Sequence, residues 1–212
     1  DKCVCPMRQR QTMSVETNGL MTLRQIVTSV KRGASSSYLK GGDREMQVIK
    51  AKDITEDGSI AFSQVDWEQV KFSERVERNV LHAGDILLSL RGSLFKILVV
   101  PPEAEGMSFA ANFVALSVDT SVLSPEIVAW YLRSEQVVQY LRGKATGAVI
   151  LSVSLDDVLS LPICIPSSDQ QAEILEFLHL KRDVCQNAAA QMALLDRISD
   201  ELLRVYLREG QV

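Results

Sequence analysis

Basic side chains gather at three loops that also carry glycine and a hydroxyl residue. Ammonium, guanidinium, hydroxyl and backbone N–H groups at close range are the donors that phosphate oxygens accept. We therefore predict one phosphate-binding surface, although a solvated surface loop is the alternative for each segment. Lys96 could simply flank a strand, and Arg44 could pair with Asp43 or Glu45. The predicted surface consists of Lys31, Arg32, Ser35, Lys40, Arg44, Arg91, Ser93, Lys96, Arg142, Lys144 and Thr146.

Residue patterns for catalysis, cofactors or metals are missing from the sequence. There is no G-x-G turn for a dinucleotide or methyl donor, and no Asp/Glu-x-Lys cluster of the kind found in many nucleases. The two histidines, His82 and His179, lie far apart, and the four cysteines lack the spacing of a zinc site. Asp85 follows a turn glycine, so a structural role is expected for it. We predict a binding module with no catalytic residues, no metal and no cofactor.

Composition fits a globular chain whose acidity lies largely at its C-terminal end. The 212 residues are 46% hydrophobic and carry a net charge of −4. Five of the 23 basic and eight of the 27 acidic residues lie from Ser168 onward, which leaves 18 and 19 for the rest. No apolar run approaches the ~20 residues of a membrane span. Few, scattered cysteines favour a reducing compartment without disulfides. We therefore expect a cytoplasmic protein with no membrane contact.

Short elements should position the basic loops. The sequence predicts a short helix or turn over 23–27, a hairpin that joins 46–54 to 60–62 through Asp57-Gly58, and strands over 84–90, 96–100 and 112–118. Ser124-Pro125 should cap a helix that ends at Gly143, with Val138 on its buried stripe. Ser154 should cap a further short helix, and a strand should follow between Pro162 and Pro166.

A single long helix is predicted from Ser168 to Arg208, where neither Gly nor Pro occurs. Ser168 and Gln171 have the chemistry of a capping box at its start. The helix could instead pack on the preceding part of the chain, or form a helical hairpin with a break near 183–187. A long, narrow apolar seam favours pairing with another helix. The seam that would form the dimer interface consists of Ile174, Phe177, Lys181, Val184, Ala188, Gln191, Leu195, Ile198, Leu202 and Val205.

These elements predict an α+β chain: one globular mixed-sheet domain followed by a long C-terminal coiled-coil helix. The expected boundaries are an N-terminal arm over residues 1–20, a compact domain over 21–167 and the helix over 168–208.

A series of short motifs follows one another along residues 22–208. They are Leu23 to Gly33, Lys52-Asp53-Ile54 with Gly58, Leu81 to Ser89 (Leu-x-x-Gly-Asp-Ile-Leu-x-Ser), Gly92-Ser93 with Lys96, Tyr131 to Ser134, Gly147 to Pro166, and Gln170 to Ile174. In this order they resemble the DNA-specificity subunit of type I restriction-modification systems, with Gln170 in the place of that family's acid. Such subunits usually carry two target-recognition domains and two long helices, so this chain resembles a half-length form.

The resemblance implies sequence-specific binding of double-stranded DNA by a recognition domain similar to that of a Taq-type adenine methyltransferase. It also implies a methyltransferase subunit and, in a complete system, a translocating nuclease subunit as the partners that supply catalysis. The sequence leaves open whether the chain serves a full restriction system, serves a methylation-only system or is an orphan subunit. A protein-interaction scaffold that keeps the fold without reading DNA is the alternative function, and an unrecognised hydrolase comes third.

On this interpretation the predicted basic surface is a DNA-binding face. Most of its residues should contact phosphate, and one or two arginines should read guanine in the major groove, a contact worth about 1–3 kcal/mol. A homodimer paired through the C-terminal helix would then read two identical half-sites in inverted orientation.

Overall fold

A computed structural model describes residues 17–35, 42, 44–55, 58–71, 74–92, 96–147 and 151–208 of the chain. The chain divides into two compact units, Asp1–Gln171 and Ala172–Val212, which we call the body and the C-terminal unit. Cys3 and Cys5 lie outside the described residues, as does most of the predicted arm. Residues 17–20 do not belong to an arm, because they form part of the strand β1 (Thr17–Thr22), which pairs antiparallel with β9 (Pro162–Pro166).

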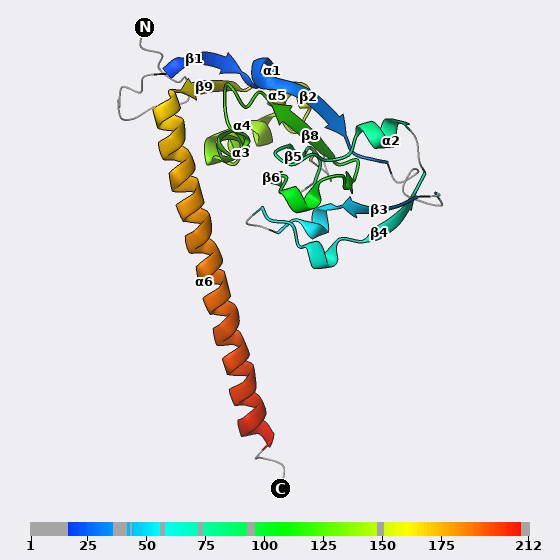
Figure 1. Ribbon diagram of the computed structural model, residues 1–212, viewed down its shortest axis with the longest axis vertical. Helices are drawn as coiled ribbons and strands as arrows, with labels where there is room; N and C mark the ends of the chain where they lie inside the picture. Colours follow the sequence, from blue (N-terminus) through cyan, green and yellow to red (C-terminus); the bar gives the residue numbers. More distant parts are fainter. Residues whose placement is uncertain are drawn as a thin grey trace. The chain divides into compact units, whose positions relative to one another are not determined.

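The described residues of the body form three sheets (Figure 1). Besides β1 and β9, an antiparallel sheet has the order β2-β8-β5-β6, and a smaller sheet has the order β4-β3-β7, with β3 and β7 parallel. The strands are β2 (Val27–Arg32), β3 (Arg44–Ile49), β4 (Trp67–Val70), β5 (Ile86–Ser89), β6 (Ile97–Val99), β7 (Ser108–Phe109) and β8 (Phe113–Val118). The predicted mixed-sheet body is therefore confirmed.

Much of the apolar core lies between the β2-β8-β5-β6 sheet and the β4-β3-β7 sheet. All four residues of β5 are buried, as the continuous apolar run predicted. Phe109 and Phe113 are the largest fully buried side chains, and they join residues of β3, β5 and β6 in one apolar cluster. Such burial supplies most of the favourable free energy of folding, and it holds the loops at the ends of β2, β5 and β8 in place.

Helices cover the sheets and connect them. They are α1 (Leu23–Ile26), α2 (Glu74–Arg78), α3 (Pro125–Leu132), α4 (Glu135–Lys144) and α5 (Leu155–Leu159), with short 3-10 helices at Ala51–Asp53, Phe62–Gln64 and Pro102–Ala104. The predicted N-caps of α3 and α5 are confirmed: Ser124 Oγ accepts from Ile127 N, and Ser154 Oγ accepts from Asp157 N.

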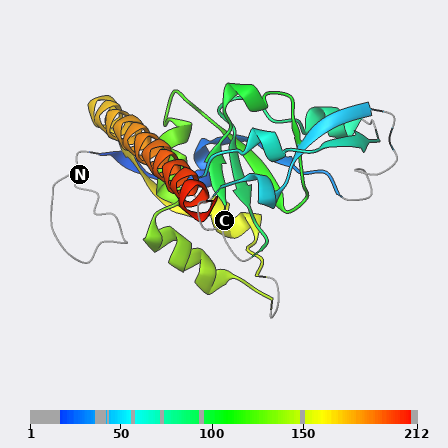
Figure 2. The ribbon, with the colours of Figure 1, turned by 90° about the horizontal axis from the view of Figure 1, so that it is seen from below.

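The single helix expected between Ser124 and Gly143 is wrong, because the structure has two (Figure 2). Ser134 caps the second, α4, since its hydroxyl accepts from Val137 N at 3.5 Å. The break shifts the buried stripe, so Val137 is buried in place of the expected Val138. Gly143 lies inside α4 and does not end it.

The expected hairpin between 46–54 and 60–62 is also wrong. A 3-10 helix follows β3, and the two segments are joined by the isolated bridge of Ile54 with Ile60 and by a hydrogen bond from Ala61 N to Asp53 O, with no strand ladder among the described residues. The antiparallel partner of β3 is β4 instead, in a register that sets Arg44 opposite Val70. The turn that contains Gly58 (φ +83°) thus closes a small loop and not a two-stranded ribbon.

The long helix is confirmed as α6 (Ser168–Arg208), which begins at the end of the body and continues through the C-terminal unit (Figure 1). Its cap lies one residue earlier than predicted. Ser167 Oγ accepts from Gln170 N at 3.4 Å, and Gln170 Oε1 accepts from Ser167 N at 3.0 Å, which is a capping box. Gln171 instead donates to the carbonyls of Val122 and Pro166.

Candidate nucleic-acid interface

Two of the three basic loops meet through one short segment, residues 151–153. Ser152 exchanges backbone hydrogen bonds with Thr146, each of 2.9 Å. On its other side it bridges Arg91, and the flanking bonds run from Gly92 N to Leu151 O and from Val153 N to Leu90 O, both at 3.0 Å. The loop after β5 and the loop after α4 therefore lie on either side of Ser152.

The first loop reaches the same region through a close backbone contact. Gly33 donates to Phe113 O, and Ala34 donates to Phe109 O at 2.7 Å. A Cβ atom on Gly33 would lie only 2.0 Å from Ala110 O, so any other residue would push the loop away from the segment between β7 and β8. Glycine is thus required here by the close approach of two backbones.

A hollow of about 620 Å³ lies where these loops meet. It is open to solvent and combines arginines, hydroxyl groups and an amide with the backbone of the loops. Among the residues that line it are Arg32, Gly33, Ser35, Leu90, Arg91, Asn112, Ser152, Ser154 and Asp156. The structure therefore brings three of the predicted surface residues, Arg32, Ser35 and Arg91, to one concave place, which we call the arginine hollow.

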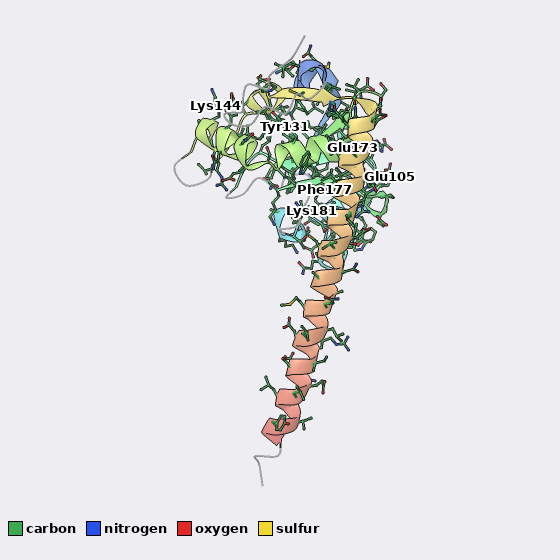
Figure 3. All side chains as sticks on the ribbon, turned by 90° about the vertical axis from the view of Figure 1, so that its left-hand side faces the viewer. Glu105, Tyr131, Lys144, Glu173, Phe177 and Lys181 are labelled. Carbon is green, nitrogen blue, oxygen red and sulfur yellow. The ribbon has the colours of Figure 1, made fainter. Side chains whose placement is uncertain are left out.

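The third loop borders this place without lining it. Thr146 is exposed and bonds to Ser152, the shared neighbour of Arg91. Arg142 and Lys144 are exposed in the last turn of α4, where Lys144 Nζ lies 5.8 Å from the centre of the Tyr140 ring (Figure 3). These cations add positive charge near the end of a helix, where the macrodipole is negative.

Lys31 does not lie on this surface, and its predicted place in an exposed loop is wrong. It belongs to β2, its side chain is buried, and its ammonium donates to Asp85 Oδ2 at 2.7 Å. The Asp85 carboxylate also accepts hydrogen bonds from Ser117 Oγ and from His82 N. Lys31 therefore stabilises the sheet from inside.

Burial opposes ionisation of Asp85, but the hydrogen bonds from Lys31, Ser117 and the backbone of His82 outweigh it, so the pKa of Asp85 is lowered. The carboxylate is therefore charged throughout the ordinary pH range.

The other predicted residues are spread over the body. Lys96 donates to the carbonyls of Ala51, at 2.6 Å, and Ile54, so its ammonium binds the loop after β3. Arg44 is exposed in β3, in the smaller sheet, and does not line the hollow. Lys40 and Ser93 lie outside the described residues.

Sequence reasoning missed several residues of the hollow. Asn112 precedes β8, and its carbonyl accepts from Leu90 N at 2.9 Å, which places the residue beside Arg91. Asp156 carries the opposite charge, but it accepts from Arg24 at 2.7 Å across an exposed ion pair. Nothing in the local pattern around Ser152 or Asn112 marks them, because only the fold brings their segments together.

Some common site types are absent from the described part of the chain. Among those residues, no group of three or more His, Cys, Asp and Glu side chains could hold a metal ion. No helix there is both long enough and apolar enough to cross a membrane.

Comparisons with known proteins agree on the fold. No family model matches the sequence, and no curated protein matches it. Among solved structures, a chain from work on complex assembly and conformational transition of the type I R-M system is similar, with a TM-score of 0.65 and 17% identity over 91% of this chain and 49% of that one. The HsdS subunit from Thermoanaerobacter tengcongensis has a TM-score of 0.61 and 18% identity, over 90% of this chain and 48% of its own.

The type I restriction-modification S subunit from M. genitalium is a third similar structure, with a TM-score of 0.54 and 14% identity over 86% of this chain and 43% of that chain. This chain spans somewhat less than half of the length of each of these three solved chains. The body and the helix that follows it therefore have the fold of the specificity subunits of type I restriction-modification systems.

Proposed function

We propose that the chain recognises double-stranded DNA through the arginine hollow and the loops beside it. The observation that carries the proposal is that Arg32 and Arg91, from separate segments of the chain, line one hollow together with Ser35 and Asn112. Guanidinium groups bind phosphate and the major-groove edge of guanine, and an asparagine amide fits adenine. Thr146, Arg142 and Lys144 would add contacts to the phosphate backbone at the rim.

The fold supports a specificity subunit of a type I system, of which this chain would supply one recognition domain and one long helix. On this proposal the chain reads one half of a bipartite target and is not itself an enzyme. Its partners are a methyltransferase subunit and, in a complete system, a restriction subunit, in the cytoplasm of a prokaryote. A second copy, paired through α6 as a coiled coil, completes the target with an inverted half-site.

A scaffold that keeps the fold without reading DNA is the second candidate. The net charge of −4 favours it, and so does the use of Lys31 and Lys96 for contacts within the body. Because the net charge is negative, the long-range electrostatic field of the chain does not attract a polyanion such as DNA. The local arrangement of arginines must therefore provide the attraction.

Selection of bound sequences from a random duplex pool, with the methyltransferase partner present, tests the proposal. The expected result is an inverted repeat of two short half-sites separated by a fixed gap. A specificity subunit with an altered hollow, Arg91→Ala with Asn112→Ala, should enrich a different or weaker repeat. A pool that shows no enrichment with the unaltered chain would favour the scaffold.

A further inference from the structure

The arginine hollow includes a carboxylate, that of Asp156. Phosphate oxygens are negatively charged and accept hydrogen bonds, so a carboxylate repels them. A surface that bound only the phosphate backbone would be lined by cations, hydroxyl groups and backbone N–H groups. The hollow instead combines the donors of Arg32 and Arg91 with a side chain that only accepts.

Stability alone does not explain why Asp156 lies in the hollow. Its ion pair with Arg24, at 2.7 Å, is exposed at both side chains, by 84% for Asp156 and 56% for Arg24, and such pairs contribute little to stability. An acid in the first turn of α5 also interacts favourably with the positive end of the helix. Asp157 provides the same interaction, and its carboxylate accepts from Ser154 Oγ at 2.5 Å.

The pair with Arg24 holds the Asp156 carboxylate between two anchored elements. Asp156 lies in α5, and the segment before this helix is tied to β5 by the bond from Val153 N to Leu90 O. Arg24 lies in α1, where the neighbouring Leu23 is buried and donates from its backbone to Leu161 O at 3.0 Å. A side chain that is held in this way is better positioned for recognition than one on a free loop.

The carboxylate can still accept a further donor. One of its oxygens accepts from Arg24, and a carboxylate has two oxygens with about four lone-pair sites. Because the side chain is largely exposed, a donor on a ligand can reach it. The hollow therefore presents a fixed acceptor beside its arginines.

In the major groove of DNA, the donor that matches a carboxylate is the N4 amino group of cytosine. Adenine also presents an amino group, but its N7 acceptor lies beside that group, and a carboxylate has no proton to donate to N7. The guanine that pairs with cytosine presents O6 and N7, which are the acceptors that a guanidinium binds. A carboxylate and an arginine in one hollow are thus complementary to the whole major-groove edge of a G·C pair.

We propose that Asp156 accepts a hydrogen bond from a cytosine amino group in the half-site, while an arginine of the hollow binds the guanine of the same pair. Arg24 is a positioning residue, because it acts through the carboxylate that it holds. The inference rests on the proposed function for the presence of DNA in the hollow. It adds the identity of one base pair and excludes phosphate from the part of the hollow beside Asp156.

Sequence selection with a variant of Asp156 tests the inference. The full chain and its Asp156→Asn variant are each used, with the methyltransferase partner present, to select from the same random duplex pool. The unaltered chain should enrich half-sites with a fixed G·C pair. Asparagine keeps the shape of the side chain but gains an amino donor, and its amide matches adenine. The variant should therefore lose about tenfold in discrimination at that pair, or select A·T there, with the other positions unchanged.

Asp157→Asn is the matched control, because it removes the same charge one residue further along the chain, and Asp157 is not among the residues that line the hollow. It should select the same sequence as the unaltered chain. Neither variant should bind random duplex at low salt more weakly than the unaltered chain, which shows that both remain folded. An unchanged preference in Asp156→Asn, or an equal loss in Asp157→Asn, would overturn the inference.

The same selection separates this inference from the proposed function. A repeat that the unaltered chain enriches and that Asp156→Asn leaves unchanged would remove the inference alone. A pool that shows no enrichment with the unaltered chain would remove the proposed function and the inference with it.

Two variants of Arg24 test its positioning role. Arg24→Lys keeps a cation beside the carboxylate and should keep the selected G·C pair, whereas Arg24→Met should weaken that preference severalfold without changing the urea unfolding midpoint. If Arg24→Met instead leaves the preference unchanged and lowers the salt slope of binding by about 1, Arg24 contacts phosphate, and its positioning role is wrong.

Discussion

Lys31 and Arg32 are neighbours in the sequence with opposite environments. Alternation along β2 turns Lys31 into the body, where it meets Asp85, while Arg32 lines the arginine hollow. The sequence shows two adjacent cations and predicts the same role for both. Only the register of β2 on β8, which sets Lys31 opposite Ala115 and Arg32 opposite Val114, separates a structural cation from a binding one.

Replacing Lys31 with Met should destabilise the body strongly. The Asp85 carboxylate would remain buried without its cation, which typically costs about 3–5 kcal/mol. Urea unfolding followed by tryptophan fluorescence measures this loss. Lys52→Met is the matched control, because Lys52 pairs with Asp66 at an exposed position and should contribute less than about 1 kcal/mol. Equal stabilities of the two variants would show that the Lys31–Asp85 pair is not a structural contact.

The lowered pKa of Asp85 gives its stabilisation a defined pH dependence. A carboxylate whose pKa is lower in the folded than in the unfolded protein stabilises the fold above its unfolded pKa, about 3.9. That contribution is lost as the pH falls through the folded value. The difference in unfolding free energy between the unaltered chain and Asp85→Asn should therefore be constant above about pH 5 and shrink below about pH 4. A difference that grows on acidification would contradict this assignment.

Among the elements, those set by local chemistry could be predicted from the sequence. The buried run of β5, the N-caps Ser124 and Ser154 and the long α6 all follow from residues close together in the chain. The pairings of β3 could not be predicted, because β4 and β7 compete for it with the nearer segment around Ile60.

The same distinction applies to the candidate site, of which the smaller part was visible in the sequence. The glycine loops with Arg32 and Arg91 stand out by composition. Ser152 lies beside Arg91 because of backbone hydrogen bonds, which any residue type can make and which therefore leave no pattern in the sequence.

The capping box at the start of α6 gives a test at the scale of one element. Ser167→Ala removes the acceptor for Gln170 N and should cost about 1 kcal/mol of stability. Ser168→Ala is the matched control, because Ser168 already lies inside the helix and its exchange should cost a few tenths of a kcal/mol at most. Hydrogen exchange at the Gln170 amide measures the effect locally. Faster exchange in Ser168→Ala than in Ser167→Ala would assign the cap to Ser168 instead.

At the scale of the whole molecule, the body has one proposed binding hollow and α6 has one unpaired seam. The proposed function uses both, because the body would read bases and the helix would set the distance to a second body. The proposed homodimer would carry two bodies and two copies of α6.

Leu195→Asp should split the proposed dimer and leave the body folded. A carboxylate in the middle of the seam would be buried without a cation in both copies, so the dissociation constant should rise at least a hundredfold. Light scattering measures the mass, and the fluorescence of Trp67 and Trp130, both in the body, reports its fold. Arg197→Asp is the matched control, since it changes charge on the opposite face of α6. A control that dissociates as readily as Leu195→Asp would show that the seam is not the interface.

Binding of random duplex DNA as a function of salt tests the central claim most directly. The unaltered chain should bind at low salt, and its affinity should fall linearly with salt on logarithmic axes, since each neutralised phosphate releases counterions. Arg32→Ala with Arg91→Ala should weaken binding at least tenfold and lower the salt slope by about 2 per body, while Lys52→Ala should leave both nearly unchanged. Absence of binding by the unaltered chain at low salt, or equal binding by all three, would contradict the claim that the arginine hollow contacts DNA.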